Sequence, residues 1–586
     1  NSVSGNTVLG ESALDASVSG GNNTAIGKNA LTTNTSGNSN VAVGHEALEL
    51  NTTGNANTAI GDEALESNTT GITNTGVGND ALNLNTTGSQ NVAVGGAALT
   101  LNTSGDSNVA IGSNALDANT TADNNTAIGR HALSANSTGE DNVAVGANAL
   151  DANTTASNNV AIGKHALGLN TTGTQNVAVG SLALDAATDV SNLTAVGYAA
   201  LSANTSGTSN TAIGGSALVS NTTGGSNTAL GNASLAANTT ASNNTGIGFS
   251  ALLSNTTASF NTAVGKDSLK QNTTGNRNTS TGCNSLDANT TGSELSAFGH
   301  NALGSNTTGG SNCAFGKDSL EENTTASNNS AFGHSALQKN TTGDDNTAMG
   351  KAALSNNTTG ADNTAYGKDA LVNNTTASNN TAVGLSALES CTIGSNNTAI
   401  GKDALDSLTS SGANTAVGVG AGHGITLGSS NTCLGVNAGN TITEGSTNII
   451  LGQNAQPPTA VSNNQVVFGT SDVAAIRCVQ TSISGLSDVR DKTDIVDNED
   501  GLQLINSLKS RKFTWAMREP SANDGKTQLG FIAQEVSEAI GNKNDYINIV
   551  DKDNPDRWEL APAKLIPILV KAVQELSAKV TALEAG

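Results

Sequence analysis

Ser487 and Lys492 stand five residues apart in the segment Ser-Asp-Val-Arg-Asp-Lys, near the C-terminal end of the chain. A serine hydroxyl is a poor nucleophile until a base removes its proton, and a lysine amine can be that base if burial or neighbouring cations lower its pKa. Arg490 is one source of such a cationic field, although it can equally pair with Asp488 or Asp491. This spacing allows nucleophilic attack on a carbonyl, but a lone Ser and Lys pair is a weak indication by itself.

The composition of the chain excludes most ordinary protein classes. Of its 586 residues, 2% are aromatic and 12% are charged, whereas ordinary domains carry about 25% charged residues. The net charge of −23 disfavours nucleic acid and anionic membrane surfaces as partners. No apolar run approaches the roughly 20 residues that span a bilayer, so we expect no membrane insertion. Because the first residues contain no charged and apolar leader, we expect that a targeting or attachment segment is missing or already removed.

A strict repeat of 17 residues explains this composition. Glycine recurs every 17 residues from Gly10 to Gly469, which makes 28 repeats without an insertion. Leucine follows four residues later in the first 24 repeats, from Leu14 to Leu405. A disordered polar polymer has no reason to hold such a phase, so the repeat is structural.

Each repeat is best interpreted as one coil of a parallel β-solenoid. The period is too short for a helical hairpin repeat. Each unit holds one strand-like run such as Asn57-Thr58-Ala59-Ile60 and then an Ala-Leu pair that can form a second short strand, and its Asn-Thr-Thr-Gly is typical of a turn. The invariant glycine indicates a positive φ or a close backbone approach, and stacked Asn and Thr side chains can form hydrogen-bonded ladders between coils. The thin core favours three-fold association of chains.

Runs such as Asn-Val-Ala-Val-Gly at 40–44 and Asn-Thr-Ala-Ile-Gly at 57–61 resemble the head repeats of trimeric autotransporter adhesins. This resemblance implies left-handed parallel β-rolls that are wound as trimers. The units here are longer than the usual repeat of that family, and no membrane-anchor barrel follows them; a different domain does.

Several residue types in the repeats are interpreted as structural. The Cys residues fall at different repeat positions and predict neither disulfides nor a metal site, so we expect neither a metal nor another cofactor. Phe298, Phe315 and Phe332 share one position in consecutive units and are predicted to stack inside the solenoid. Asn-Thr-Thr matches the glycosylation acceptor pattern, but a hydrogen-bonding turn explains every copy. The five Cys are Cys283, Cys313, Cys391, Cys433 and Cys478.

The composition changes near residue 483. We therefore predict a solenoid shaft over 1–482, with divergent last repeats over 407–482, and a globular domain over 483–586. This domain ends in a predicted coiled-coil helix over 563–585, because apolar residues are spaced alternately three and four apart. An amphipathic helix packed on its own domain is the alternative. The seam consists of Ile566, Leu569, Val573, Leu576, Val580 and Leu583.

Four ordered motifs make this domain resemble the endosialidase-type intramolecular chaperone of phage tail fibres and spikes. The motifs are 487–492, Phe-Thr-Trp at 513–515, Gly-Phe-Ile-Ala-Gln-Glu-Val at 530–536, and 565–576. The resemblance implies a small α+β domain that trimerises, directs folding of the fibre before it, and then cuts itself off with a Ser-Lys dyad, here Ser487 and Lys492. The scissile bond should touch Ser487, either as Leu486–Ser487 or as Ser487–Asp488, and the sequence does not choose.

These observations favour a mostly β protein, a homotrimeric β-solenoid shaft of a phage tail fibre or spike, located in the virion tail. The expected partners are two further copies of the chain, a host cell-surface receptor, with glycan as a candidate, and other tail proteins joined through a missing N-terminal segment. A bacterial cell-surface fibre or adhesin with the same chaperone is the alternative. A polysaccharide-cleaving solenoid is a weaker third class, because no pair of carboxylates stands out. No activity on external substrates is predicted.

Overall fold

The structure is a computed structural model that describes residues 4–470, 473, 487–516, 525–552 and 558–586. The chain divides into two compact units, Asn1–Gly360 and Ala361–Gly586. The first unit contains strands β1–β21, and the second contains β22–β28 followed by a small domain. The predicted boundary at residue 483 lies outside the described residues.

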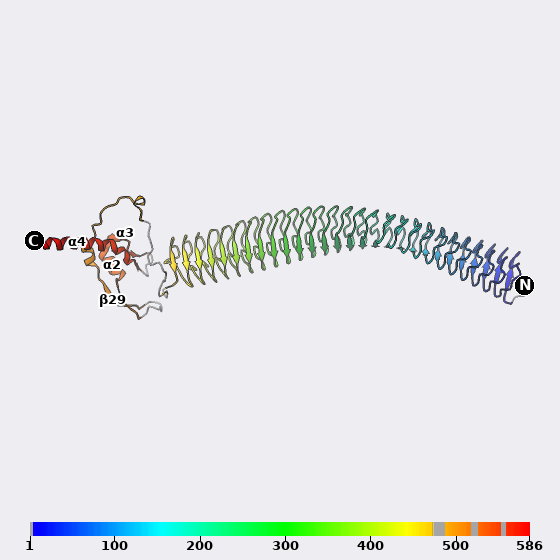
Figure 1. Cartoon of the computed structure of the whole chain (residues 1–586), viewed down its shortest axis with the longest axis horizontal. Helices are drawn as coiled ribbons and strands as arrows, with labels where there is room; N and C mark the ends of the chain where they lie inside the picture. The colour runs from blue at the N-terminus through cyan, green and yellow to red at the C-terminus, as the bar shows by residue number, and fades with distance from the viewer. Residues whose placement is uncertain (1–3, 471–472, 474–486, 517–524, 553–557) are drawn as a thin grey trace. The chain divides into compact units, whose positions relative to one another are not determined.

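The repeats form a parallel β-solenoid of 28 strands, one strand per repeat, and in Figure 1 the arrows of successive coils lie side by side. Identical positions pair across the coils, as Ala144 does with Ala161. The mostly β solenoid predicted from the period is therefore confirmed. The strands are β1 (Thr7–Leu9), β2 (Thr24–Ile26), β3 (Val41–Val43), β4 (Thr58–Ile60), β5 (Thr75–Val77), β6 (Val92–Val94), β7 (Val109–Ile111), β8 (Thr126–Ile128), β9 (Val143–Val145), β10 (Val160–Ile162), β11 (Val177–Val179), β12 (Thr194–Val196), β13 (Thr211–Ile213), β14 (Thr228–Leu230), β15 (Thr245–Ile247), β16 (Thr262–Val264), β17 (Thr279–Thr281), β18 (Ser296–Phe298), β19 (Cys313–Phe315), β20 (Ser330–Phe332), β21 (Thr347–Met349), β22 (Thr364–Tyr366), β23 (Thr381–Val383), β24 (Thr398–Ile400), β25 (Thr415–Val417), β26 (Thr432–Leu434), β27 (Ile449–Leu451) and β28 (Val466–Phe468).

The invariant glycine follows each strand and satisfies both predicted requirements. Gly61, for example, has φ of +142°, and a Cβ built on it would lie 2.3 Å from the carbonyl oxygen of Gly78 in the next coil. A side chain therefore has neither an accessible backbone conformation nor space at this position.

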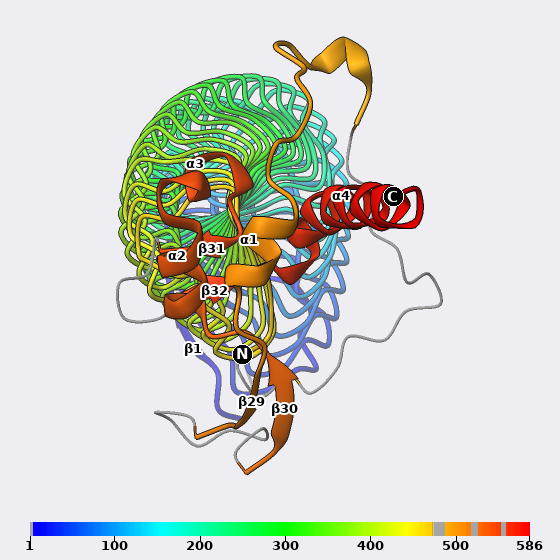
Figure 2. The same ribbon diagram turned by 90° about the vertical axis from the view of Figure 1, so that its left-hand side faces the viewer.

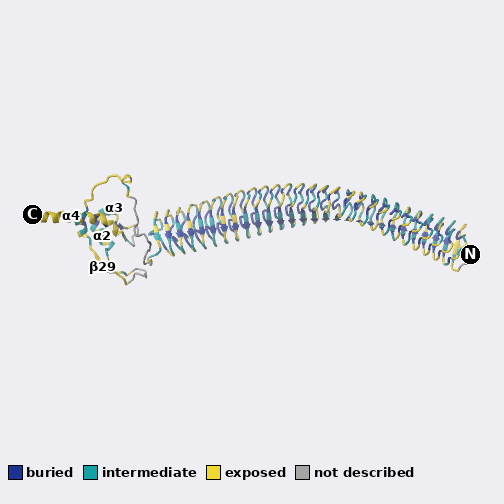
Figure 3. Cartoon of the chain, in the orientation of Figure 1, coloured by how far each residue is buried: buried dark blue, intermediate teal, exposed yellow. Residues whose placement is uncertain are grey.

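The interior of each coil is made of small residues and one leucine. In β4 the middle residue Ala59 is fully buried, while Thr58 and Ile60 are more exposed, and after the glycine Ala64 and Leu65 are fully buried. Figure 3 shows these buried residues as dark blue along the coils. The core is thus built from Ala, Ala and Leu, and the Val and Ile of the strands lie outside it.

The prediction of a second strand at the Ala-Leu pair is wrong. Leu65 has φ of 53°, and the leucine of all 24 repeats that contain it adopts the same left-handed conformation. This conformation costs a non-glycine residue roughly 1–2 kcal/mol, and burying a leucine side chain returns about 1.5–3 kcal/mol. The pair is a turn that aims the leucine into the coil.

The divergent late repeats replace this leucine by a coupled exchange. Gly422 and Gly439 occupy the leucine position with φ of 60° and 64°. Ile425 and Ile442, three residues further on, are fully buried where earlier repeats have asparagine. A Cβ on Gly422 would lie 3.1 Å from Cδ1 of Ile425, so the isoleucine fills the space that leucine fills elsewhere.

Two ladders of fully buried asparagine run through the solenoid, as predicted. In one ladder, Oδ1 of Asn125 accepts from the backbone N–H of Asn142 at 3.0 Å, and its Nδ2 donates to the carbonyl of Gly139 at 2.9 Å. In the other, Nδ2 of Asn119 donates to Oδ1 of Asn102 at 2.8 Å. Because the second ladder contains the asparagine of the Asn-Thr-Thr segments, that side chain is inaccessible in the folded coil.

The aromatic residues at 298, 315 and 332 do not lie inside the solenoid, which corrects the sequence-based prediction. The rings stack with centroids 4.5 Å and 5.1 Å apart. In each of β18, β19 and β20, however, the buried residue is the central alanine, and the phenylalanine is partly exposed on the outward face. Side chains alternate along a strand, so an inward alanine sends both its neighbours outward.

The small domain is α+β. Its two sheets are antiparallel pairs, β29 with β30 and β31 with β32, and Figure 2 shows the β29–β30 hairpin projecting away from the helices of the domain. No helix of the described residues is long and apolar enough to cross a membrane. The elements are η1 (Val489–Asp491), α1 (Leu502–Ser507), β29 (Arg511–Thr514), β30 (Thr527–Gly530), α2 (Ala533–Ile540), η2 (Gly541–Lys543), α3 (Asn544–Ile547), β31 (Val550–Asp551), β32 (Glu559–Leu560), η3 (Pro562–Leu565) and α4 (Ile566–Glu584).

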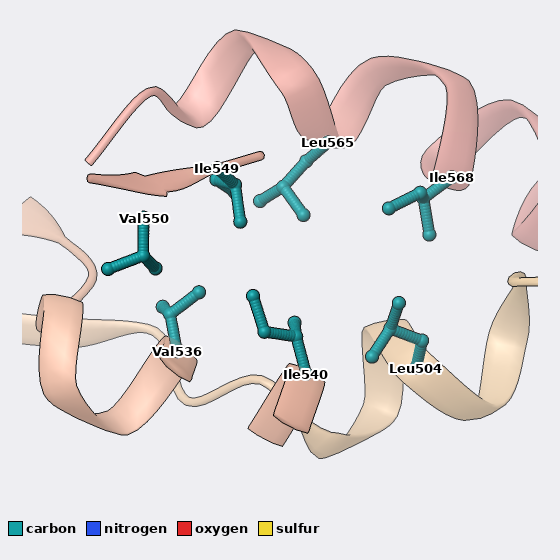
Figure 4. Packing of buried hydrophobic residues seen from close by; sticks show 7 residues of the cluster. All are labelled: Leu504, Val536, Ile540, Ile549, Val550, Leu565 and Ile568. Carbon is teal, nitrogen blue, oxygen red and sulfur yellow. The ribbon is translucent and has the colours of Figure 1, made fainter. Parts of the chain in front are cut away.

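The core of this domain is a single cluster of aliphatic side chains contributed by α1, α2, β31, η3, α4 and the residue before β31. Figure 4 shows them pointing toward one another. Pro562 begins η3 and Pro567 lies in the first turn of α4. The cluster consists of Leu504, Val536, Ile540, Ile549, Val550, Leu565 and Ile568.

The asparagine ladder predicts that alanine substitutions at two neighbouring residues differ sharply in their effect on the stability of the coil. Replacing Asn125 by Ala leaves the buried N–H of Asn142 without its acceptor, which should destabilise that coil by about 1–3 kcal/mol. Asn124→Ala is the matched control, because Asn124 is exposed and Ala56 already occupies the equivalent left-handed position. Hydrogen exchange of the 139–145 segment should accelerate in Asn125→Ala alone; equal rates in both variants would contradict the ladder.

The buried cysteines predict a thiol-labelling pattern. Burial raises the pKa of Cys391 to about 11 and that of Cys433 to about 12, so neither is a thiolate near neutral pH. At pH 8, both thiols should resist a disulfide reagent in the folded protein and react in denaturant. Rapid labelling of either residue in the folded state would show that its coil is open.

Candidate functional site

Ser487 and Lys492 meet across one short turn. Asp488 is the N-cap of η1, and its side chain accepts the backbone N–H of Arg490 at 2.9 Å. Lys492 is the C-cap residue, and its backbone N–H donates to the carbonyl of Val489. This turn brings Nζ of Lys492 to 2.6 Å from Oγ of Ser487. The structure therefore places the two predicted residues within hydrogen-bond distance, which is the arrangement that a nucleophile and its base require.

Arg490 belongs to a different pair. Its guanidinium donates through Nε to both carboxylate oxygens of Asp488, at 3.0 Å and 3.1 Å, and also through Nη2. The guanidinium keeps the pKa of Asp488 below its usual value. Of the two roles considered for Arg490, the structure thus shows pairing with Asp488, and that carboxylate compensates the positive charge beside Lys492.

The segment after the turn is anchored to the small domain at Asp500. This carboxylate is buried and accepts hydrogen bonds from Nζ of Lys543 and from the hydroxyl of Tyr546. The hydrogen bonds from Lys543 and Tyr546 lower its pKa. The anchor ties the segment that leads away from Lys492 to η2 and α3.

The surroundings of the dyad are open to solvent in the single chain. Both Ser487 and Lys492 are exposed, and η1 contributes no buried residue. Leu486, on the other side of one candidate scissile bond, lies outside the described residues. The geometry supplies a nucleophile and a proton acceptor, but neither the burial nor the uncompensated cation that would activate a lysine.

The helix α4 carries two separate apolar stripes. One stripe, Ile568 and Ala572, is buried on the domain together with Leu565 just before the helix. On the same side, the carboxylate of Glu575 accepts the backbone N–H of Leu502 at 2.8 Å. The other stripe is the predicted seam, whose exposed fractions are 59% at Ile566, 44% at Leu569, 64% at Val573, 50% at Leu576, 44% at Val580 and 81% at Leu583. The helix therefore does pack on its own domain, but through residues other than the seam.

A group of carboxylates on the solenoid was not singled out from the sequence. Ligand oxygens of Glu46, Glu49 and Glu66 lie within 4.8 Å of one another. Burial, together with the charges of Glu46 and Glu66, raises the pKa of Glu49. The sequence could have predicted their proximity, because these residues occupy positions two and five after the glycine in successive coils. Such partly exposed acidic groups are common at surfaces without a bound ion.

A fibre-like protein with a C-terminal chaperone is the class that the solenoid and the small domain define. Residues 487–544 match the family described as chaperone of endosialidase. The match begins at Ser487 and ends before α4. Comparison with curated proteins found no match, and comparison with solved structures found none either.

The anchor at Asp500 predicts a pH dependence. Its pKa is lower in the folded chain than the unfolded value of about 3.9, so the stability it contributes is present above that value and is lost as the pH falls through the folded pKa. At pH 6 the small domain of Asp500→Asn should melt at a lower temperature than that of the wild type, and the gap should narrow as the pH falls below the unfolded value. Asp494→Asn, at an exposed position, is the control; a gap that does not change with pH would contradict the anchor.

Proposed function

We propose that the chain is the shaft of a homotrimeric phage tail fibre or spike, whose C-terminal domain aligns three chains, directs the folding of the solenoid and is then released by cleavage at Ser487. The attachment of an endosialidase-type chaperone to a long β-solenoid carries this proposal. The mature shaft would lie in the virion tail, join other tail proteins and contact a receptor on the host cell surface. Its role is structural and adhesive.

The exposed seam of α4 supports the trimer. Six aliphatic side chains at heptad spacing remain in solvent although the same helix buries a neighbouring stripe. Heptad positions of this kind are covered by other helices in a coiled coil. Parallel association of three copies would cover all six at once.

The outward face of the solenoid is a second, independent argument for the proposed trimer. None of the first and third residues of the 28 strands is charged, although the chain as a whole is acidic. The third residues are Val, Ile or Leu in most coils and are partly or largely exposed, such as Ile60 at 42% and Leu230 at 43%. Only a partner with the same axial repeat fits such a face along its length, and a second copy has that repeat.

Assembly of the trimer would also supply the burial that Lys492 lacks in the single chain. In the single chain Lys492 is exposed and Arg490 is paired with Asp488, so the base has no source of activation. Approach of another copy would bury the turn, and burial favours the neutral amine that a base requires. Cleavage would then follow association, and the C-terminal domain would be released only after the chains are aligned. A long interlocked solenoid can keep its register afterwards because its unfolding is slow.

The cleavage step is tested by Ser487→Ala, which should leave a full-length chain in a denaturing gel or mass spectrum. Lys492→Met should do the same because it removes the base, whereas Lys512→Met, at an exposed lysine of the β29 hairpin, should cleave normally. The released fragment begins at Ser487 or at Asp488, according to which bond is cut. Persistent cleavage in Ser487→Ala would exclude Ser487 as the nucleophile.

The coupling to assembly is tested by seam variants that leave the dyad intact. Leu569→Lys with Leu576→Lys adds charge to the seam and should abolish association and cleavage together. Gln574→Lys adds a charge to an exposed position of α4 outside the seam and should preserve both. Normal cleavage in a monomeric seam variant would contradict the coupling.

A further inference from the structure

Three stacked aromatic rings lie on the outward face of the solenoid, where most other coils carry similar aliphatic side chains. The third strand residue is aliphatic in most coils, so sliding one chain past another by one coil exchanges nearly identical side chains. Phe298, Phe315 and Phe332 depart from this pattern, as Tyr366 and Phe468 also do, but these three form a continuous ring stack on β18–β20. The stack marks one axial level of the shaft.

The coil before the stack is polar on both sides of its strand. Thr281 occupies the outward position of β17, and Ser280 occupies the inward position that is alanine in most coils. Ser280 is stabilised there by Ser268, whose hydroxyl donates to it at 2.8 Å. A slip of one coil in this direction would place Phe298 against Thr281 of another copy, an apolar ring against a hydroxyl.

The orientation of the rings decides what they can contact. Their planes are nearly parallel, at 11° and 5°, so the ring faces are occupied by each other and the edges point away from the strand. These apolar edges can be buried against apolar side chains of another copy. Stacked faces are not available as a flat platform for a sugar, so the arrangement suits another copy of the same stack better than a carbohydrate.

We propose that Phe298, Phe315 and Phe332 form an interchain aromatic cluster that fixes the axial register of the three copies, with Thr281 rejecting the neighbouring register. This inference rests on the proposed trimer but goes beyond it. The C-terminal domain would align the chains first, and the cluster would hold that alignment within the solenoid, including after the domain is released.

The chain contains a natural reporter of this contact. Cys313 is the first residue of β19 and lies on the same outward face as Phe315, so at matched register the three copies of this thiol lie at the same level. Burial raises its pKa, so cross-linking is done at mildly alkaline pH. In full-length Cys283→Ser with Cys478→Ser, oxidation should link up to about two thirds of the chains as dimers, because one disulfide joins two of three thiols.

Cys283 provides the matched control. It follows the glycine after β17 and lies off the strand face, so Cys313→Ser with Cys478→Ser should give little interchain product under the same conditions. A trimer by native mass that links through Cys283, or that links at neither thiol, would overturn the inference and leave the proposed function standing. A monomer would overturn both.

The register function is tested by replacing all three phenylalanines with Val, the residue of many other coils, in the Cys313 reporter. Loss of the cluster should lower the yield of Cys313 dimers roughly tenfold, which corresponds to about 1.4 kcal/mol. The control Ile213→Ala, Leu230→Ala, Ile247→Ala removes similar apolar area from three other consecutive coils and should keep the yield. An unchanged yield in the phenylalanine variant, or an equal loss in the control, would overturn the register function.

Discussion

The contact between the invariant glycines of neighbouring coils is the constraint on which the rest of the solenoid depends. The backbones approach so closely that a Cβ on Gly129 would lie 2.6 Å from both the carbonyl carbon and the carbonyl oxygen of Gly146. Each coil must therefore return to the same point after 17 residues, and every other position stacks on its own copy. Each repeated position therefore needs a residue that can stack on its own copy. The buried ones are asparagines that hydrogen-bond to each other, small alanines, and one leucine per coil. The shortage of charged residues is a consequence of the same rule, since like charges at one coil spacing repel.

The period, the strand that precedes each invariant glycine and the asparagine ladders could be predicted because each recurs strictly in the sequence. Which side chains point into the coil could not be predicted from the sequence. Hydrophobicity ranks Ile60 above Ala59 as a core residue, yet Ala59 is buried and Ile60 is largely outside. The narrow coil has room for a methyl group in the strand and takes its one large side chain from Leu65 in a left-handed turn. That conformation is unfavourable for leucine in isolation, so only the geometry of the closed coil reveals it. The inward interpretation of the phenylalanines failed for the same reason.

The candidate site was predicted in part. The segment 487–492 indicated which serine and which lysine to examine, and the turn of η1 explains how residues five apart come to 2.6 Å. The sequence left the role of Arg490 open, because a guanidinium and two neighbouring carboxylates allow several pairings. It also left open whether the terminal helix packs on its own domain or pairs with other helices. The structure separates these alternatives by face: Ile568 is buried in the domain while Leu569, the next residue, is exposed.

In the single chain, the seam of α4 and the uncharged strand face, which we propose as association surfaces, are exposed, and so is the dyad. The most direct test of this account is the mass of the wild-type protein measured under native and denaturing conditions. The account predicts a native particle of three chains, with denatured chains that end at residue 486 or 487. A native mass equal to one chain would contradict the central claim, whatever the state of the C-terminal domain.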